Sequence, residues 1–354
     1  MIYALKNFLD TNYNVINLSI VSYKLSILKL LLKFQVAIKS ALVFGSNFAL
    51  KAHFKSLKEI KEIKNLNIYS PNIKNKKLYI KKKYIVTNLK KIAFKNIDLI
   101  SIGVPPVFQK KICMTAIKNK IKFIFLEKPI SNSIKETIKI LNILKKKKVK
   151  FFINFIYPNI HAFKMLKKKI LKKKIKKILY IWKFKQVYFK NSLKTWKINK
   201  SKGGGIVDFY LIHVFYNILF LFGKFKIKNI ETFTYKELIY KIKLNLLVLS
   251  KNIEANITMD IKNEENMHSI KIFGENKIYE ISKKTSDWVK NFYLYINKKK
   301  IPIGNKAYVN RAELTKINLE KLISFNVSNE EILNFRLAHQ YCAEINKRIN
   351  FLNR

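Results

Sequence analysis

The stretch KFIFLEKPIS, residues 122–131, decides the fold, because a short apolar run ends there abruptly in Glu127, Lys128 and Pro129. Apolar runs of this length are typical of strands that are buried on both faces of a parallel sheet. Proline lacks a backbone N–H group, so it belongs at a strand end rather than inside a sheet. Ligands of parallel sheets bind beyond the carboxyl ends of the strands. The stretch therefore predicts a buried strand with an acid and a base at the end where functional residues lie.

Similar segments lie on both sides of this strand. The apolar runs are SALVFG (residues 40–45), LNIYS (66–70), the weaker YIV (84–86), DLISIGV (98–104) and VKFFINF (149–155). Helical periodicity is found over residues 49–63, 108–118 and 134–146. The alternation of buried strands with amphipathic helices predicts a Rossmann-type, doubly wound parallel sheet. We expect this domain at residues 39–155, after an N-terminal extension of unknown role at residues 1–38.

The second half of the chain has a different pattern. Apolar and polar residues alternate in KKILYIWKFKQV (176–187), KIKNIETF (226–233), YKIKLNLLVL (240–249), ANITMDI (255–261) and HSIKIFGENKIYEI (268–281). This period of two indicates a large, mostly antiparallel sheet with one solvated face. Helices are expected at residues 162–173, 205–222, 312–323 and 328–349. The fold class is thus α/β, with a Rossmann-type domain followed by an α+β domain at residues 156–354.

The chain is strongly basic, with 72 lysines and arginines against 21 acidic residues and a formal net charge of +51. Such a charge suggests a nucleic-acid or membrane-surface partner. However, the only arginines are Arg311, Arg336, Arg348 and Arg354, and arginine is the residue that usually reads bases and phosphates. The lysines are spread over nearly every segment. We therefore attribute the charge to a codon-usage bias and expect no specific nucleic-acid binding.

Other features narrow the class of protein further. Two cysteines cannot form a disulfide framework, which fits a cytoplasmic protein. Lysines interrupt the apolar region at residues 1–36, so we expect no transmembrane segment and no signal peptide there. A helix that lies on a membrane or on a partner is the alternative for this region. His161, His268 and His339 are scattered without carboxylates or cysteines at ligand spacing, so we expect no metal site.

Glycine is scarce, with 8 in the chain, yet Gly203, Gly204 and Gly205 are consecutive. They directly precede an apolar helical segment that contains His213. Such a run suggests that the backbone needs positive φ or approaches a ligand closely. A flexible loop is the alternative for the glycine run, and a histidine satisfied within the core is the alternative for His213.

Five blocks of the chain, in order, resemble one known family. They are VFGSNFALKAHFKSL (residues 43–57), IDLISIGVPP (97–106), FLEKPIS (125–131), INFIYPNIHAFKMLKKKI (153–170) and WKINKSKGGGIVDFYLIHVFYNILFLFG (196–223). The family is that of glucose–fructose oxidoreductase and inositol dehydrogenase (Gfo/Idh/MocA). The resemblance runs from about residue 40 to the C-terminus, and the order and spacing of the blocks make it specific.

The resemblance implies an NAD or NADP cofactor. It assigns cofactor binding to Gly45, Ser46, Asn47, Phe48, Ser70, Val104, Pro105, Pro106, Glu127 and Lys128. Asn47 and Leu50 stand where the glycine-rich turn has its second and third glycines, and we expect Leu50 to push helix and strand apart. Ser70 replaces the acid that usually contacts the ribose. Nearby Lys74, Lys76 and Lys77 slightly favour NADP, and His53 is expected to be structural or to lie near a phosphate.

The resemblance also assigns the catalytic residues as Lys128, His213 and Asp208. His213 occupies the family's histidine position and is expected to act as the base, while Lys128 hydrogen-bonds the developing alkoxide. Phe209 occupies the position of the family's aspartate, one helical turn before the histidine. Asp208 lies one residue earlier and therefore on a different helical face. Tyr216 stands where many relatives have a second acid.

The expected function is hydride transfer between NAD(P) and a secondary alcohol or ketone of a sugar, polyol or sugar nucleotide. The resemblance also implies a homo-oligomer, either a dimer or a tetramer. Leu50, Phe209 and the missing ribose acid support an alternative, a non-catalytic relative that is either an eroded enzyme or a binding or assembly subunit. The sequence does not distinguish the exact substrate.

Overall fold

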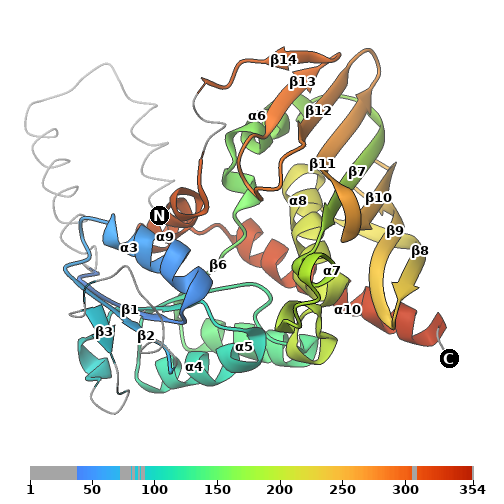
Figure 1. Ribbon diagram of the computed structural model, residues 1–354. Coiled ribbons are helices and arrows are strands. Elements are labelled where there is room, and N and C mark those ends of the chain that lie inside the picture. The colour runs from blue at the N-terminus through green and yellow to red at the C-terminus, as the bar shows by residue number, and fades with distance from the viewer. Residues whose placement is uncertain are drawn as a thin grey trace, which may run out of the picture. The chain divides into compact units, whose positions relative to one another are not determined.

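The computed structural model describes residues 38–71, 81, 84–86, 88, 92–304 and 309–352. Residues 39–354 form one compact unit (Figure 1). The expected extension at residues 1–38 lies, apart from its last residue, outside the described part of the chain. Lys74, Lys76 and Lys77 lie outside it as well.

The first sheet has six parallel strands in the order β3-β2-β1-β4-β5-β6. Its strands are β1 (Ser40–Phe44), β2 (Asn65–Tyr69), β3 (Ile85–Val86), β4 (Leu99–Ile102), β5 (Phe123–Leu126) and β6 (Lys150–Ile153). The order runs outward from β1 in both directions, so the topological switch point lies between β1 and β4. This arrangement confirms the predicted doubly wound sheet, including all six predicted strands.

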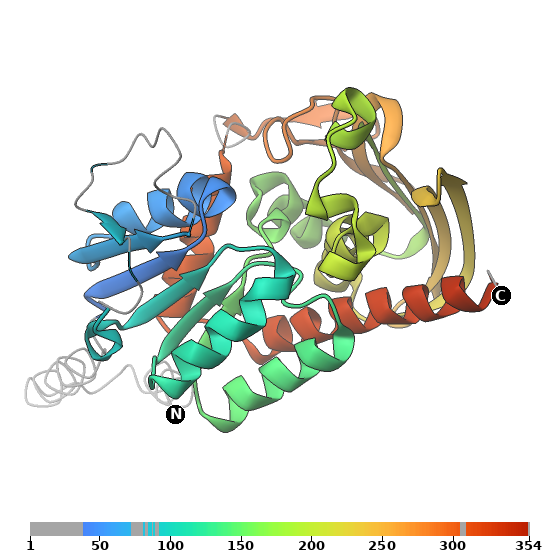
Figure 2. The same ribbon diagram turned by 60° about the horizontal axis from the view of Figure 1, so that its bottom comes forward.

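Helices cover both faces of this sheet, which explains why β1, β4 and β5 are buried at every position. One face carries α4 (Pro106–Lys118) and α5 (Ile134–Lys146), as Figure 2 shows. The other face carries η1 (Ala49–Phe54), α3 (Lys55–Lys58) and α9 (Arg311–Ile323). Although α9 follows the second sheet in the sequence, it contacts β5 and β6 of the first. The C-terminal part of the chain therefore helps to bury the Rossmann sheet.

The second sheet has eight strands in the order β14-β13-β12-β11-β7-β10-β9-β8. These are β7 (Ile175–Lys185), β8 (Phe225–Tyr235), β9 (Leu238–Val248), β10 (Ile253–Asp260), β11 (Lys262–Gly274), β12 (Ile278–Lys283), β13 (Tyr293–Ile296) and β14 (Lys299–Ile301). All neighbours are antiparallel except β7 and β10, which are parallel. The predicted, mostly antiparallel sheet is confirmed. The short strands β13 and β14 were not predicted.

Three longer helices accompany the second sheet. They are α6 (His161–Ile170), α8 (Ile212–Phe222) and α10 (Asn329–Leu352), and α10 contacts both α8 and α5. Short helical segments complete the described chain: η5 (Phe94–Asn96), η6 (Tyr157–Asn159), α7 (Val187–Asn191), η7 (Trp196–Ile198), η8 (Lys200–Lys202) and η9 (Ile206–Leu211). No helix within the described ranges has both the length and the apolar character needed to cross a membrane.

Candidate active site

The residues expected to bind the cofactor lie where four strands of the first sheet end. The end of β1 is followed by Gly45, Ser46, Asn47 and Phe48, and the end of β2 by Ser70. The end of β4 is followed closely by Val104, Pro105 and Pro106, and the end of β5 by Glu127 and Lys128. Because parallel strands end at the same edge of a sheet, these residues share the edge where doubly wound sheets bind ligands.

The turn after β1 needs glycine for steric reasons. Gly45 has a φ of +124°, and a Cβ atom there would lie 2.6 Å from the Gly103 carbonyl oxygen and 2.8 Å from the Ala49 Cβ atom. A Cβ atom on Gly103 would lie 2.7 Å from the same Ala49 atom. The helix that follows β1 thus lies directly against two glycines, one on each side of the switch point. This close approach suits a turn that receives a pyrophosphate.

Leu50 does not push this helix away from the sheet, contrary to the expectation from the sequence. Ala49 is fully buried and occupies the tight contact, whereas Leu50 is partly exposed. Ala49 is the first residue of the π-helical segment η1, whose hydrogen-bonding pattern differs from that of an α-helix. The small side chain of Ala49, rather than Leu50, therefore occupies the close contact with the two glycines.

Glu127 points into a buried polar chain. Its Oε1 atom accepts hydrogen bonds from His53 Nε2 at 2.8 Å and from Asn154 Nδ2 at 2.6 Å. The Nδ1 atom of His53 lies 2.7 Å from the Ser101 hydroxyl, which can donate to it. These contacts join the helix after β1 to β4, to the end of β5 and to the residue after β6. His53 is accordingly a structural residue, one of the two roles expected for it.

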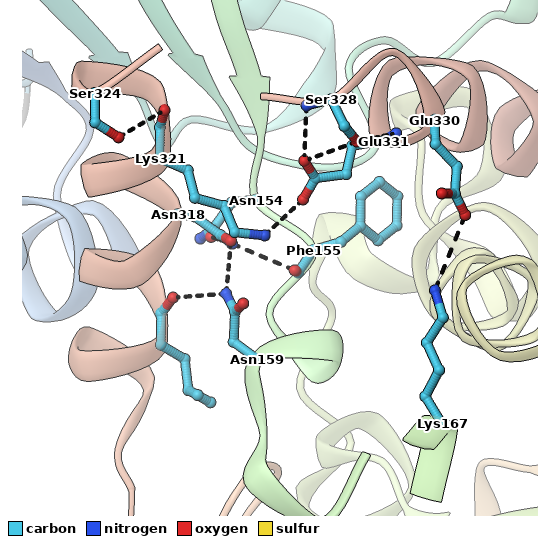
Figure 3. A network of polar contacts seen from close by, with 11 residues as sticks. Asn154, Phe155, Asn159, Lys167, Asn318, Lys321, Ser324, Ser328, Glu330 and Glu331 are labelled. Carbon is cyan, nitrogen blue, oxygen red and sulfur yellow. Dashed lines mark hydrogen bonds and ion pairs between the residues drawn. The ribbon is translucent and has the colours of Figure 1, made fainter. Parts of the chain in front are cut away.

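Three asparagines extend this chain to α9. Asn318 donates from Nδ2 to Asn154 Oδ1 at 3.0 Å and to the Phe155 carbonyl at 3.3 Å, and Asn159 donates to Asn318 Oδ1 at 2.6 Å (Figure 3). All three asparagines are buried. Sequence reasoning missed this network, because its members are ordinary polar residues that become neighbours only in the folded chain. The network fixes the strand end that carries Glu127 and Lys128.

Lys128 is buried, with 7% of its surface exposed. Its Nζ atom donates to the Phe209 carbonyl oxygen at 2.8 Å and lies 3.9 Å from the centroid of the Phe209 ring. The peptide bond between Lys128 and Pro129 is cis. Burial lowers the pKa of Lys128 to about 7, against the opposing effect of Glu127 and with a further lowering by Lys197. A part of the amine is therefore unprotonated at neutral pH, unlike that of an ordinary lysine.

His213 is a residue of α8, lies near Lys128 and is 4% exposed. The rings of Phe155, Tyr157 and Trp182 surround it, with centroids 6.0, 5.1 and 6.1 Å away. Burial, and next the charge of Lys128, hold the pKa of His213 well below its usual range. Its Nδ1 atom has no hydrogen-bond partner within the described residues. His213 is thus a neutral imidazole at pH 7.

Asp208 does not join Lys128 and His213. Its two carboxylate oxygens accept hydrogen bonds from Asn346 Nδ2 on α10 at 2.9 and 3.1 Å. Burial raises its pKa to about 6, although the hydrogen bond from Asn346 opposes that effect. Within the described part of the chain, no hydrogen bond or ion pair links Asp208 to either residue. The neighbouring Phe209 contacts Lys128 instead.

The glycine run shapes the loop that leads to this helix. Gly203 and Gly205 have φ values of +80° and +89°, which confirms the expected positive φ at these two positions. A Cβ atom on Gly203 would lie 2.8 Å from Pro106, so the run touches the loop after β4. Nearby, Tyr216 stacks on Phe155 with a centroid distance of 4.0 Å. Among the residues that the structure describes, no group of three or more His, Cys, Asp or Glu side chains could bind a metal ion.

Comparisons with known proteins agree with this geometry. Residues 39–155 match the Gfo/Idh/MocA oxidoreductase family, described as having an NAD-binding Rossmann fold. No curated protein matches the sequence significantly.

Several solved structures share the fold. D-galactose-1-dehydrogenase from Rhizobium etli has a TM-score of 0.70 at 15% identity, covering 87% of this chain and 94% of its own. Levoglucosan dehydrogenase in complex with NADH has a TM-score of 0.70 at 14% identity, and the match covers 87% of this chain and 96% of that structure's chain. A super-repressor mutant of Gal80p from Saccharomyces cerevisiae has a TM-score of 0.76 at 13% identity, covering 90% and 97%. At these identities the likeness concerns the fold alone. Residues 39–155 of this chain thus match the NAD-binding Rossmann domain of the Gfo/Idh/MocA oxidoreductase family, and the solved structures share the fold over most of the chain.

Proposed function

We propose that the chain transfers hydride between NAD(P) and a secondary alcohol or ketone of a sugar, polyol or sugar nucleotide. The observation that carries this proposal is the buried amine of Lys128, whose pKa is lowered to about 7 by burial, near the neutral imidazole of His213. Perturbed titratable groups at a ligand-binding strand edge are typical of active sites. The sugar dehydrogenases among the structural neighbours support the substrate class.

Lys128 is the proposed proton-transfer group. An alcohol that loses hydride must also lose its hydroxyl proton, and a group with a pKa near the working pH performs this step best. The amine fraction of Lys128 takes the proton in oxidation, and the ammonium fraction donates it in reduction. Burial holds the pKa of His213 well below its usual range, which makes its imidazole a poor proton acceptor, so its proposed role is to orient the hydroxyl by a hydrogen bond. These roles revise those that the resemblance assigned to the two residues.

The residues at the strand ends fit a nicotinamide dinucleotide. Gly45 and Gly103 give the turn its close backbone approach, and the helix that follows presents its first N–H groups near Asn47. The cofactor would supply the hydride acceptor or donor. We propose that Ser70 lies at the ribose, and that Pro105 and Pro106 border the nicotinamide.

A fluorescence titration with NADH and with NADPH tests the proposal at moderate salt, which suppresses nonspecific contacts with the many lysines. We expect saturable binding of one or both nucleotides, and the preferred one settles NAD against NADP. A screen of secondary alcohols follows, with Lys128→Ala as the inactive control. Absence of binding below millimolar concentrations would overturn the proposal.

A non-catalytic role is the second candidate, and one observation favours it. The Phe209 ring and carbonyl cover the Lys128 amine where relatives have an acid. The likeness to Gal80p, described as a super-repressor mutant, is compatible with such a role. In that case neither nucleotide would support turnover of any alcohol, even if one of them binds.

We propose residues 156–354 as the part that binds substrate and forms a dimer or tetramer. The eight-stranded sheet supplies a broad second surface for such an assembly. Light scattering coupled to gel filtration would give the mass of the assembly directly.

Cys113 and Cys342 are both free and buried, which is consistent with the expected cytoplasmic location.

A further inference from the structure

Two lysines share one aromatic ring at the candidate active site. The Nζ atoms of Lys128 and Lys197 lie 3.9 and 5.3 Å from the centroid of the Phe209 ring. Attraction to a ring face stabilises each ammonium group but cancels no charge. The two like charges also act on each other, since Lys197 lowers the pKa of Lys128.

A third cation, Arg311, completes what we name the cation cluster: Lys128, Lys197 and Arg311. Arg311 is the first residue of α9, and its guanidinium lies 5.4 Å from the centroid of the Trp288 ring. The Tyr210 ring joins the two parts of the cluster, since it lies 5.7 Å from Trp288 and 4.8 Å from Phe209. The cluster therefore follows one continuous aromatic surface.

The acids near the cluster have other partners. Glu127 accepts hydrogen bonds from His53 and Asn154. Asp287 accepts two backbone N–H bonds on its Oδ1 atom. Burial opposes the ionisation of Asp287, yet these bonds and the charge of Arg311 hold its pKa below the usual range. Among the described residues, no carboxylate forms an ion pair with Arg311. The cluster thus has more positive than negative charge.

The positive charges also act on one another, in each case after the larger effect of burial. Lys197 is exposed overall, yet burial of its ammonium end, and then the charge of Arg311, lower its pKa. The charge of Arg311 also contributes to the lowered pKa values of Lys128 and His213, after burial and the nearer charges. Cations that repel one another at partly buried positions destabilise the protein unless an anion joins them.

A buried hydroxyl without a partner belongs to the same group of aromatic rings, through Trp182 and Trp288. Tyr157 is 1% exposed, and its OH group has no hydrogen-bond partner within the described residues. Burial raises its pKa well above the usual range, while the charge of Arg311 opposes that effect. A buried hydroxyl without a partner is unfavourable by about 1–3 kcal/mol. It is therefore a donor that a ligand oxygen could satisfy.

The cation cluster could have arisen by chance, because any surface of this lysine-rich chain carries positive charge. Two facts oppose it. Arg311 is one of only four arginines in the chain, and its planar fork suits bidentate contact with an oxyanion. In addition, Tyr157 is not part of the lysine excess, yet its ring lies 5.8 Å from the Trp182 ring, which lies 5.5 Å from Trp288, the ring beside Arg311.

We propose that the substrate carries an oxyanion, a carboxylate or a phosphate, that binds to Arg311 and Lys197 with the Tyr157 hydroxyl as an additional donor. This proposal rests on the proposed function, because the anion belongs to the molecule whose alcohol or ketone meets Lys128. It narrows the substrate from neutral sugars and polyols to sugar acids, sugar phosphates or sugar nucleotides.

Calorimetric titration of the full chain at about 0.15 M salt tests the proposal. The probes are inorganic phosphate, D-glucuronate and D-glucose 6-phosphate, with neutral D-glucose as the matched control. We expect at least one anion to bind saturably and more tightly than glucose. Arg311→Gln should weaken that binding about tenfold or more, and Arg311→Lys, which keeps the charge but not the fork, should weaken it less. Binding of glucuronate alone would indicate a carboxylate, and binding of either phosphate probe a phosphate.

Arg336→Gln is the control for charge alone, since Arg336 lies on α10 outside the cation cluster. Equal weakening by Arg336→Gln and Arg311→Gln would overturn the proposal, as would the failure of every anion to bind more tightly than glucose. Titration of the same variants with NADH and with NADPH separates the two proposals. Cofactor binding without anion binding refutes the anion site alone, whereas Arg311-dependent anion binding without cofactor binding refutes the proposed oxidoreductase function.

Tyr157→Phe is a second variant that remains informative if Arg311→Gln fails to fold. Removal of a hydroxyl that has no partner should leave the thermal midpoint unchanged or raise it. The same change should weaken anion binding, because the ligand loses a donor. A lower midpoint with unchanged affinity would show that the hydroxyl serves the fold and does not contact the anion.

Discussion

Replacement of Lys128 by methionine should stabilise the folded protein while removing its proposed activity. Methionine has a similar length and no charge, so it can occupy the same buried position over Phe209. The buried amine has its pKa lowered from 10.5 to about 7, mainly by burial. Protonation is therefore less favourable in the folded chain than in the unfolded one, and the charged lysine destabilises the fold.

The magnitude and its pH dependence follow from that difference. One pKa unit corresponds to about 1.4 kcal/mol, so the destabilisation is about 5 kcal/mol well below pH 7 and about 4 kcal/mol at pH 7. Between pH 7 and 10.5 the unfolded chain binds more protons at Lys128 than the folded chain does. The free energy of unfolding of the wild type therefore rises with pH in this window, and the destabilisation by Lys128 falls to about 2 kcal/mol at pH 9. Loss of the hydrogen bond to the Phe209 carbonyl reduces the advantage of Lys128→Met by about 1 kcal/mol at every pH.

Urea denaturation of both proteins at pH 6, 7, 8 and 9 measures this effect. The difference between variant and wild type isolates Lys128 from other groups, such as Lys283, whose pKa is lowered to about 8 mainly by burial. Lys283→Met is a matched control, because its advantage should decline at higher pH than that of Lys128→Met. The reasoning would be refuted if Lys128→Met destabilised the protein or if its effect did not change with pH.

Other substitutions test the remaining parts of the site. Ala49→Leu should destabilise the chain by about 1–3 kcal/mol in urea, because the Ala49 Cβ atom already limits the space at two glycines, whereas Leu50→Ala should cost less than about 1 kcal/mol. His53→Ala should lower the free energy of unfolding by about 2–3 kcal/mol, since it leaves Glu127 with one fewer donor. Asp208→Asn should change turnover less than tenfold, which steady-state kinetics would show. It should also stabilise the chain above about pH 6, because the raised pKa of Asp208 disfavours its charged form in the fold.

Much of the fold could be predicted because its signals are local. Apolar runs and helical periodicity placed all six strands of the first sheet, and the predicted helix at residues 134–146 coincides with α5. The strands β13 and β14 were missed because they are short and rich in lysine and tyrosine, without clear alternation. The position of Lys128 at a strand end was also predictable, since an apolar run marks the strand and Pro129 its end.

The details of the site depend on contacts between distant residues and on helical register. Asn154 and Asn318 are 164 residues apart in sequence, so no local pattern joins them. Ala49 rather than Leu50 lies against Gly103, at the start of a π-helical segment that ordinary helical periodicity does not reveal. The pKa of Lys128 likewise depends on burial beneath Phe209, which the sequence showed only as a missing aspartate.

The most direct test of the proposed mechanism is a pH titration of the lysine ε-carbons by NMR, with ¹³C-labelled lysine in the wild type and in Lys128→Met. One resonance should titrate with a midpoint at about 7 in the wild type and be missing from the variant. Such a result would identify Lys128 as an amine that can exchange a proton with substrate at neutral pH. If the resonance lost in the variant titrates near 10 instead, Lys128 is an ordinary cation and the proposed proton transfer is wrong.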